Sequence, residues 1–150
     1  MAAKRAGMGR GLAAILPEAD QSAAGELREL PVALVTADRV IVPVQAEYLA
    51  LEGLVQFLDT LAMIRREMNP ALDVSGLLIT MHDERTRLAQ DVERELREHF
   101  PELVFRTVIP RSVRVAEAPS YGLPVTEHAP SSRASTAYRA LTEELTARGR

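Results

Sequence analysis

The pattern of apolar and polar positions over most of the chain predicts alternating strands and helices. Apolar runs rich in β-branched residues span Val40–Val44, Val74–Thr80 and Val104–Ile109, as is typical of strands buried in a parallel sheet. Between these runs, apolar residues recur at helical spacing over Leu49–Met68 and Thr86–His99. Strands that alternate with helices form βαβ units, so the pattern predicts a mostly parallel sheet covered by helices.

The same spacing predicts which face of each helix is buried. Gly53 costs about 1 kcal/mol relative to alanine inside a helix, so we expect close packing at this position. Glu93 and Arg97 are expected on the solvated side of the second helix. A last helix is expected after Ser131 or Ser132, which can cap it. The predicted buried stripes are Leu51, Leu54, Val55, Leu58, Leu61 and Ala62; Leu88, Val92 and Leu96; and Ala134, Ala137, Tyr138, Leu141 and Leu145.

Upstream of these elements the chain changes character. Residues 17–25 are small and polar and are predicted to form a linker, which divides the chain into a basic arm and linker (1–25) and an α/β domain (26–150). Residues 26–35 alternate in part and predict a strand. The connection over residues 36–38 is too short for a parallel crossover, so we expect one long strand over residues 30–44.

The first 16 residues contain basic residues and no acidic ones. Leu12, Ile15 and Leu16 fall on one helical stripe, but this apolar run is too short for a secretory signal, which needs about 7–15 apolar residues. Two interpretations stay open: a disordered tail, or a peptide that folds on a partner.

Composition narrows the classes of function. The chain has 150 residues, of which 47% are hydrophobic and 26% charged, as in ordinary globular proteins. The net charge of −3 gives no global attraction to nucleic acid, so any such attraction must be local. Cysteine is absent, which excludes disulfides and thiolate ligands and suits a reducing cytoplasm. No apolar run approaches the roughly 18 residues of a membrane span.

The stretch with most functional information follows the third predicted strand. Pro110 ends that strand, and the loop after it carries Arg111 and Arg114 and then a run of small residues. The sequence FRTVIPRSVRVAEAPSYGLP resembles the C-terminal part of the ParA/Soj-type partition ATPases, deviant P-loop proteins that segregate bacterial DNA. TADRVIVPVQAEYLALEGL resembles the strand that follows the Walker B region in the same family. The resemblance covers residues 36–150 and implies a partial doubly wound parallel sheet of the ParA/MinD type, lacking the P-loop unit.

The first 35 residues carry a second resemblance. KRAGMGRGLAAILPEAD is similar to the extreme N-terminus of ParB-type centromere-binding proteins, whose basic GRGL-containing segment stimulates the ParA ATPase. GELRELPVALV resembles the strand with which the ParB core begins. The resemblance implies that Arg10 acts in trans on the phosphate region of a partner ATPase; the alternative is a solvated charge.

The chain lacks the residues for phosphate chemistry. A P-loop requires G-x-x-x-x-G-K-[ST], in which backbone amides cradle phosphate and the lysine contacts its outer oxygens. Lys4 is the single lysine, and no glycine precedes it. We therefore expect no ATP hydrolysis and no bound cofactor for the chain alone, although the family resemblance implies ATP and Mg²⁺.

The resemblance carries over base-binding and DNA-binding roles. The runs TMHD and IPR match loops on which the adenine base rests in the family, so the implied base-binding residues are Thr80, Met81, Pro110 and Arg111. ParA proteins bind DNA non-specifically through loop arginines, a role carried here to Arg111, Arg114, Arg85 and Arg87. Alternatively, Met81 and Pro110 only pack, and the arginines form surface ion pairs with Glu117, Asp83 or Glu84, worth about 0–1 kcal/mol each.

The resulting hypothesis is a catalytically incomplete partition protein of the ParA type. It would bind a ParA-type ATPase or ParB-type protein, weakly bind non-specific DNA, and lie in the cytoplasm at the nucleoid. Dimerisation stays open. The alternatives are an ATPase completed in trans by a partner chain, and a small α/β binding domain with no enzymatic role.

Overall fold

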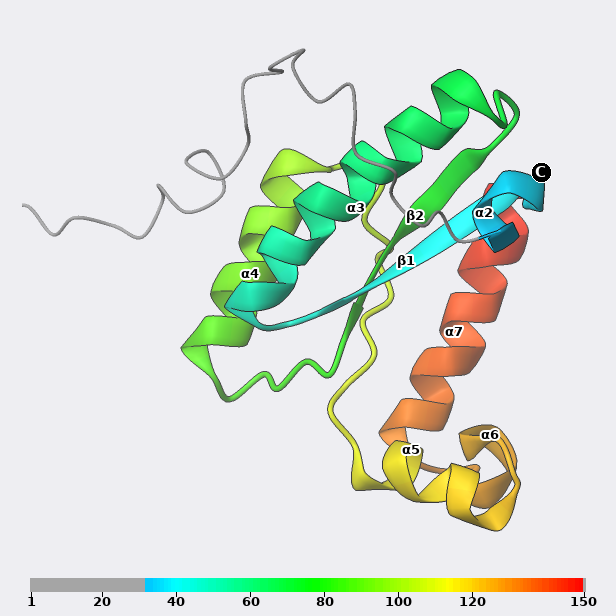
Figure 1. Cartoon of the computed structure of the whole chain (residues 1–150). Coiled ribbons are helices and arrows are strands. Elements are labelled where there is room, and N and C mark those ends of the chain that lie inside the picture. The colour runs from blue at the N-terminus through cyan, green and yellow to red at the C-terminus, as the bar shows by residue number, and fades with distance from the viewer. Residues whose placement is uncertain (1–31, 150) are drawn as a thin grey trace, which may run out of the picture.

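The computed structural model describes residues 32–149, which form an α/β fold (Figure 1). Residues 1–31, with Arg10 and most of the ParB-like segment, lie outside the described residues. The predicted alternation of strands and helices is confirmed. The elements are α2 (Val32–Thr36), β1 (Arg39–Gln45), α3 (Tyr48–Glu67), β2 (Asp73–Thr80), α4 (Arg87–His99), α5 (Val113–Glu117), the 3₁₀ helix η1 (Ala118–Tyr121), α6 (Val125–His128) and α7 (Arg133–Arg148).

Strands β1 and β2 pair in parallel, from Arg39 opposite Asp73 to Gln45 opposite Thr80. The register shifts between Val40 and Ile41, where the ladder contains an irregularity. The connection between the strands is α3, a crossover helix of 20 residues, as a parallel pair requires.

The predicted strand Val104–Ile109 is not a continuous strand in the structure. The segment runs parallel to β2 and pairs with it near its ends. The N–H of Phe105 donates to the carbonyl of Leu77, and the N–H of Ile109 donates to that of Ile79, both at 2.9 Å. The described sheet therefore has two regular strands and, along the other edge of β2, an extended segment over residues 103–111.

Glu144 on α7 explains the interruption. Its carboxylate accepts the backbone N–H groups of Arg106 and Thr107 at 2.8 and 2.9 Å. One turn later, the guanidinium of Arg148 lies 3.1 Å from the same carboxylate and 4.3 Å from the centroid of the Phe105 ring. Glu144 is only 7% exposed, and charge-assisted bonds at a buried site are strong. The middle of the segment is thus held by α7 instead of β2.

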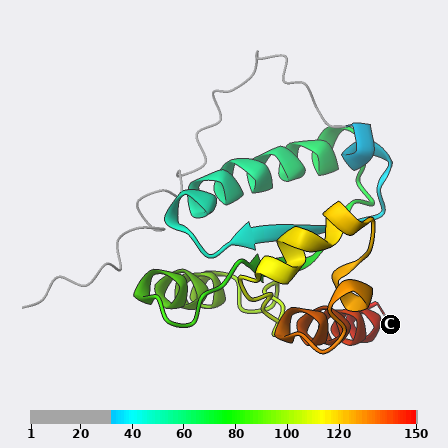
Figure 2. The same ribbon diagram turned by 90° about the horizontal axis from the view of Figure 1, so that it is seen from below.

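Helices cover both faces of the sheet, with α3 and α4 on one side and α7 on the other (Figures 1 and 2). The doubly wound arrangement is therefore confirmed. The larger core lies under α3 and α4, and the smaller one lies under α7. The first includes Val42, Val44, Leu51, Leu54, Leu61, Ile64, Leu77, Ile79, Val92 and Leu96; the second consists of Leu78, Phe105, Ile109 and Leu141.

The stretch predicted as a loop after Pro110 contains three short helices, α5, η1 and α6. They form a lobe at the foot of α7 (Figure 1) with its own apolar cluster of Ala118, Val125 and Ala134. The rings of Tyr121 and His128 stack with centroids 4.6 Å apart. Helices of four or five residues are too short to produce a readable apolar period, which is why the sequence pattern missed them.

The prediction of one long strand over residues 30–44 is wrong, because residues 32–36 form α2 and only residues 39–45 form a strand. The side-chain amide of Asn69, just after α3, donates to the carbonyl of Ala37 at 2.8 Å. This long-range bond satisfies the backbone between α2 and β1, and residues 26–35 contain no local signal for it.

The predicted helix boundaries are confirmed to within two residues, but the buried stripes need correction. Ala62 is exposed and Leu88 is 45% exposed, while Ile64 and Ala89 are buried instead. The expected close packing at Gly53 is also wrong, since a Cβ at this exposed position would meet nothing within 4 Å.

Replacing Gly76 by alanine should strongly destabilise the fold. Gly76 has φ +157°, and a Cβ there would lie 2.6 Å from the carbonyl oxygen of Leu103 and 2.7 Å from the Phe105 ring. We expect a loss of about 3 kcal/mol in unfolding free energy, because overpacking and backbone strain each cost about 1–3 kcal/mol. Urea denaturation measures it. The matched control, Gly53→Ala, should stabilise by about 0.5–1 kcal/mol. An unchanged Gly76→Ala stability would contradict the close approach of residues 103–105 to β2.

Replacing Glu144 by glutamine should destabilise the fold in a pH-dependent manner. Burial by itself raises the pKa of Glu144. The N–H groups of Arg106 and Thr107, together with Arg148, lower the pKa by more than burial raises it, so the net pKa lies below the ordinary 4.5. A carboxylate with a depressed folded-state pKa contributes stability above its unfolded-state pKa, and this contribution is lost as the pH falls through the folded-state value.

We expect Glu144→Gln to lose about 2 kcal/mol at pH 7, the typical net value of bonds to a charged group. The difference from the wild type should be constant well above the ordinary pKa of 4.5, which applies to the unfolded chain, and should narrow as the pH falls below it. Denaturant unfolding at pH 7, 4 and 3 measures it. Glu143→Gln removes the same charge from the adjacent exposed position and should change stability by less than about 0.5 kcal/mol. A gap of equal size at all three pH values would rule out the carboxylate as the source.

Candidate functional site

The carboxyl ends of β1, β2 and the extended segment meet at one edge of the sheet, where ligands of open α/β sheets bind. The N–H of Ala46 donates to the carbonyl of Thr80 at 3.0 Å, which joins the ends of β1 and β2. On the other side of β2, the N–H of His82 donates to the carbonyl of Ile109 at 3.1 Å. The N–H of Arg111 donates to the carbonyl of His82 at 2.9 Å. The structure thus brings together the predicted base-binding residues Thr80, Met81, Pro110 and Arg111.

Met81 has an unusual backbone at this edge. Its φ is +53°, a left-handed conformation that costs energy for a side chain other than glycine and is typical of functional positions. The side chain is 42% exposed, whereas Pro110 is half-buried and forms a bridge with His82. Met81 therefore offers an apolar contact surface at this edge of the sheet.

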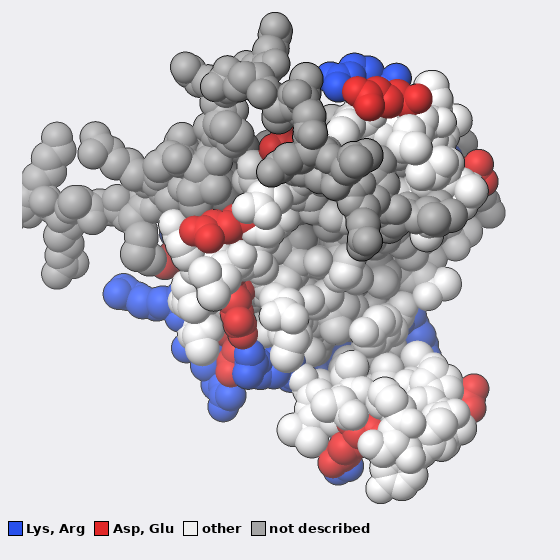
Figure 3. All heavy atoms as spheres, in the orientation of Figure 1, with Lys and Arg blue, Asp and Glu red and all other residues white. Residues whose placement is uncertain are grey.

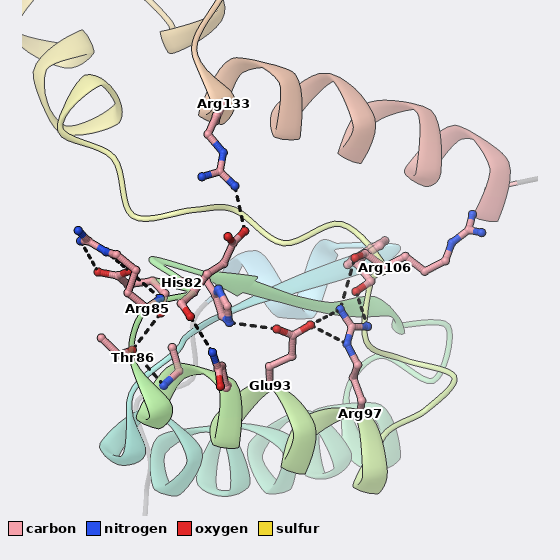
Figure 4. Close-up of polar contacts among 12 residues, drawn as sticks. His82, Arg85, Thr86, Glu93, Arg97, Arg106 and Arg133 are labelled. Atoms are coloured by element: carbon pink, nitrogen blue, oxygen red, sulfur yellow. Dashed lines mark hydrogen bonds and ion pairs between the residues drawn. The ribbon is translucent and has the colours of Figure 1, made fainter.

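His82 anchors the loop after β2 to α4. Its ring is buried, and Nε2 lies 3.0 Å from Oε2 of Glu93, but without the alignment of a hydrogen bond. The other oxygen of Glu93 accepts from Nε of Arg97 at 3.0 Å (Figure 4). A cavity of about 490 Å³ adjoins this group between α4 and α7, lined among others by His82, Glu93, Pro110 and Arg133. Glu93 and Arg97 are half-buried here, so the expectation of a solvated pair is wrong.

Two of the predicted DNA-binding arginines lie near the junction of β2 and α4: Arg85 in the connecting loop and Arg87 as the first residue of α4. Arg85 donates from Nε and Nη2 to the two carboxylate oxygens of Asp83 at 3.0 and 2.9 Å. The Arg85 side chain and its backbone N–H lower the pKa of Asp83 to about 2. Arg87 is exposed, and within residues 32–149 it has no ion-pair partner. The nearby Glu84 lies 3.0 Å from Arg133 of α7 (Figure 4).

The other two predicted arginines follow the extended segment. Arg111 donates to Glu47, just after β1, at 2.9 Å, and Arg114 on α5 donates to Glu117 at 3.0 Å. Each arginine of these two pairs is more than half exposed. Positive and negative side chains also lie close together over the start of α4, while the visible face of the lobe is mostly white, with acidic and basic groups at its edges (Figure 3).

Sequence reasoning missed Glu47, the partner of Arg111. Glu47 comes two residues after the end of β1, and this strand-end position could have identified it. It also missed the partnership of His82 with Glu93, which joins a loop to a helix and leaves no local pattern.

A larger hollow, of about 730 Å³, lies at the opposite, amino-terminal end of the strands. Its lining includes Arg39, Asp73 and Arg148, but Arg148 is committed to Glu144 and to backbone carbonyls. We place the candidate site at the carboxyl edge, where several strand ends converge. Among residues 32–149 no cluster of three or more potential metal ligands occurs. None of the helices described there is long and apolar enough to cross a membrane.

Comparison with known proteins gives the relationship. A chromosome-partitioning ATPase Soj of Thermus thermophilus is 57% identical over 116 residues, which is 77% of this chain and 47% of the relative. The sporulation initiation inhibitor protein Soj of Bacillus subtilis is 44% identical over 117 residues (78% and 46%). The chromosome partitioning protein ParA of Caulobacter vibrioides is 43% identical over 118 residues (79% and 44%). This chain is homologous to part of the ParA/Soj chromosome-partitioning ATPases.

The chain spans about half the length of these curated relatives. A family model described as an AAA domain matches residues 28–74. Among solved structures, cobyrinic acid a,c-diamide synthase from Mycobacterium smegmatis matches with a TM-score of 0.54 and 32% identity, over 71% of this chain and 37% of that one. The same enzyme with a bound ATP analogue and magnesium matches with a TM-score of 0.56, 33% identity, and 71% and 38% coverage. Residues 32–149 thus have an α/β fold with a parallel sheet, similar to part of these solved structures of the P-loop ATPase family.

The ion pair between Asp83 and Arg85 can be tested by titration. The carboxyl ¹³C shift of Asp83 should titrate near pH 2 in the wild type and move toward the ordinary 3.8 in Arg85→Ala, because the variant loses the side-chain hydrogen bonds. Arg87→Ala, which removes an equal charge two residues away, should leave the titration near its wild-type position. A wild-type midpoint near 3.8 would show that Arg85 is not engaged by Asp83 in solution.

Proposed function

We propose that this chain is a partition protein of the ParA type that is catalytically incomplete and binds non-specific DNA weakly. The observation that supports the partition role best is the 57% identity to a chromosome-partitioning ATPase Soj. Binding to the nucleoid in the cytoplasm would follow from DNA binding.

Catalytic incompleteness is supported by the residues available for ATP and Mg²⁺. The sequence has no glycine-rich loop followed by lysine, because its one lysine is Lys4 and no glycine precedes it. At the carboxyl edge, Met81 and Pro110 offer a surface for a base, but the nearest cation, Arg111, is paired with Glu47. These residues could contact the base of a nucleoside triphosphate, but they do not supply the backbone amides and lysine that bind its phosphates.

DNA binding is supported by the exposure of the loop arginines. Arg111, Arg114 and Arg85 each form a surface ion pair. The side chain of each of these arginines is at least 55% exposed. Such pairs are worth only about 0–1 kcal/mol, so DNA phosphates can compete with the carboxylates for the same guanidinium groups. With a net charge of −3, affinity should be weak and fall with salt.

A partner ATPase is the second element of the proposal. Support comes from the basic segment of residues 1–16, in which Arg10 would act on the phosphate region of the partner. Thr80, Met81, Pro110 and Arg111 would contact the base of a nucleotide whose phosphates the partner holds. The second candidate function, an ATPase completed in trans, is favoured by the same grouping of residues at the carboxyl edge.

The DNA-binding role predicts a loss of affinity when Arg111 and Arg114 are both replaced by alanine. Binding to a random-sequence duplex, measured by fluorescence anisotropy from 50 to 200 mM salt, should weaken. The slope of log K against log salt should shrink by about 2, because each lost phosphate contact removes about 0.9. Binding with an unchanged salt slope would contradict the assignment of these two arginines.

The matched control is Arg66→Ala with Arg94→Ala. These arginines are also in surface ion pairs, with Glu67 and Asp91, on α3 and α4. The net charge changes equally, so a similar loss of DNA affinity in both double variants would indicate only a charge effect.

ATP turnover by the isolated chain would contradict catalytic incompleteness.

A further inference from the structure

His82 is a buried polar residue at the centre of the carboxyl edge. Its side chain is only 6% exposed, and its Nε2 atom is shielded from solvent. Met81 precedes it in the chain, Pro110 forms a bridge with it, and Arg111 donates its N–H to the carbonyl of His82. One buried residue therefore adjoins three of the four residues to which base binding is assigned.

The backbone and the ring of His82 hold different parts of the molecule. Both backbone groups bond to the extended segment, the N–H at 3.1 Å and the carbonyl at 2.9 Å. These bonds join the loop after β2 to the loop after the extended segment. The ring is the part of His82 that meets α4, so it decides how this pair of loops is placed against the helix.

Glu93 of α4 contacts the ring and is itself held in place. Its Oε2 lies 3.0 Å from Nε2 of His82, and its Oε1 accepts from Nε of Arg97 at 3.0 Å (Figure 4). Arg97 also donates from Nη1 to the carbonyl of Phe105 at 3.1 Å. Because these contacts run back to the extended segment, the carboxylate meets the ring from a fixed position.

The position of the ring proton decides whether this contact stabilises the edge. The separation of 3.0 Å between Nε2 and the carboxylate is that of a hydrogen bond, yet Nε2 has no aligned partner among the described residues. A buried polar group without a partner is costly, and a carboxylate can only accept. A His82 tautomer with its proton on Nε2 satisfies both groups after a small rotation of the ring.

Packing alone leaves the ring room to move. The cavity of about 490 Å³ between α4 and α7 is lined by both His82 and Glu93, so a ring that is not bonded to Glu93 can turn into it. Met81 depends on the same ring, because a left-handed backbone at a residue other than glycine persists only where its surroundings fix it. Loss of the contact would release Met81 and the loop of Arg111 together.

We propose that His82 is a positioning residue of the carboxyl edge, whose Nε2–H donates to Glu93 and thereby fixes Met81 and Arg111 relative to each other. The ring touches neither the base nor the phosphate. The inference rests on the proposed function for what Met81 and Arg111 bind, whereas the placement of the two residues is tested without a ligand.

The first test reads the ring and the backbone of the full chain by NMR. The ¹⁵N shifts of the His82 ring should show the proton on Nε2, and Glu93→Ala should move the Nε2 shift. His82→Phe keeps a planar ring and removes both nitrogens. It should speed amide exchange at Arg111 at least about tenfold, the equivalent of one buried hydrogen bond.

A second amide separates positioning from a general loss of stability. Phe105 donates its N–H to Leu77 in the core. Its exchange should change less than about twofold in His82→Phe, because local opening at the carboxyl edge leaves the core closed. Global destabilisation would speed exchange at Arg111 and Phe105 alike.

A double-mutant cycle assigns the effect to the contact. Glu93→Ala should speed exchange at Arg111 as His82→Phe does. The double variant should exchange no faster than the faster single variant, because both changes remove the same bond. The control is His99→Phe, which should leave exchange at Arg111 unchanged. His99 is exposed on the same helix, and its Nδ1 lies 2.8 Å from the carbonyl of Glu95.

DNA binding then connects placement with function. On a random-sequence duplex, His82→Phe should weaken affinity at least about threefold and lower the salt slope by up to about 0.9, the loss of one phosphate contact. His99→Phe should bind as the wild type does.

Three results would overturn the inference: a ring proton on Nδ1 alone, unchanged exchange at Arg111 in His82→Phe, or additive effects in the cycle. Where urea denaturation shows His82→Phe unfolded, the ring shifts and Glu93→Ala decide. A wild type that does not bind DNA would contradict the proposed function and leave the exchange test in force. DNA binding retained by His82→Phe despite faster exchange at Arg111 would contradict positioning for phosphate.

Discussion

The buried carboxylate of Glu144 decides how the last third of the described chain is arranged. The N–H groups of Arg106 and Thr107 donate to this carboxylate and not to β2, so without it both would lose their acceptor. Glu144 also fixes Arg148 over the ring of Phe105. One acidic residue on an otherwise apolar stripe of α7 thus replaces the middle of a β-ladder. Helix α7 therefore covers the sheet and also supplies the hydrogen-bond acceptor for the middle of the extended segment.

This constraint reaches the carboxyl edge through the backbone. Past the Glu144 contact, the segment returns to β2, and Ile109 and Arg111 bracket the backbone of His82. The buried ring of His82 then meets Glu93 on α4. The position of Arg111 is consequently set from two sides, by α7 through the extended segment and by α4 through His82. A loop with this support can present a charged side chain in a defined place.

The sequence pattern located β1, α3, β2, α4 and α7 because each has its own local apolar period. The two large errors have non-local causes. Residues 104–109 look like a strand, yet Glu144, about 40 positions downstream, takes their middle N–H groups. An acid on the predicted α7 stripe, between Leu141 and Leu145, was the available signal. Residues 26–35 looked like a strand too, and Asn69 beyond α3 fixes the chain after α2. The residues to which the resemblance assigns base binding lie at one edge of the sheet, and their role stays a prediction. Glu47 was missed because it forms a pair across 64 positions.

The two kinds of ion pair in this chain have different consequences for function. Glu144 is buried and pairs with backbone N–H groups and with Arg148, so breaking these contacts leaves its carboxylate as a buried charge and costs stability. Arg111 and Glu47 are half exposed, and a phosphate can replace that carboxylate at little cost. Glu47 lies two residues beyond the end of β1, so the end of this strand also sets the position of the acid that competes for Arg111.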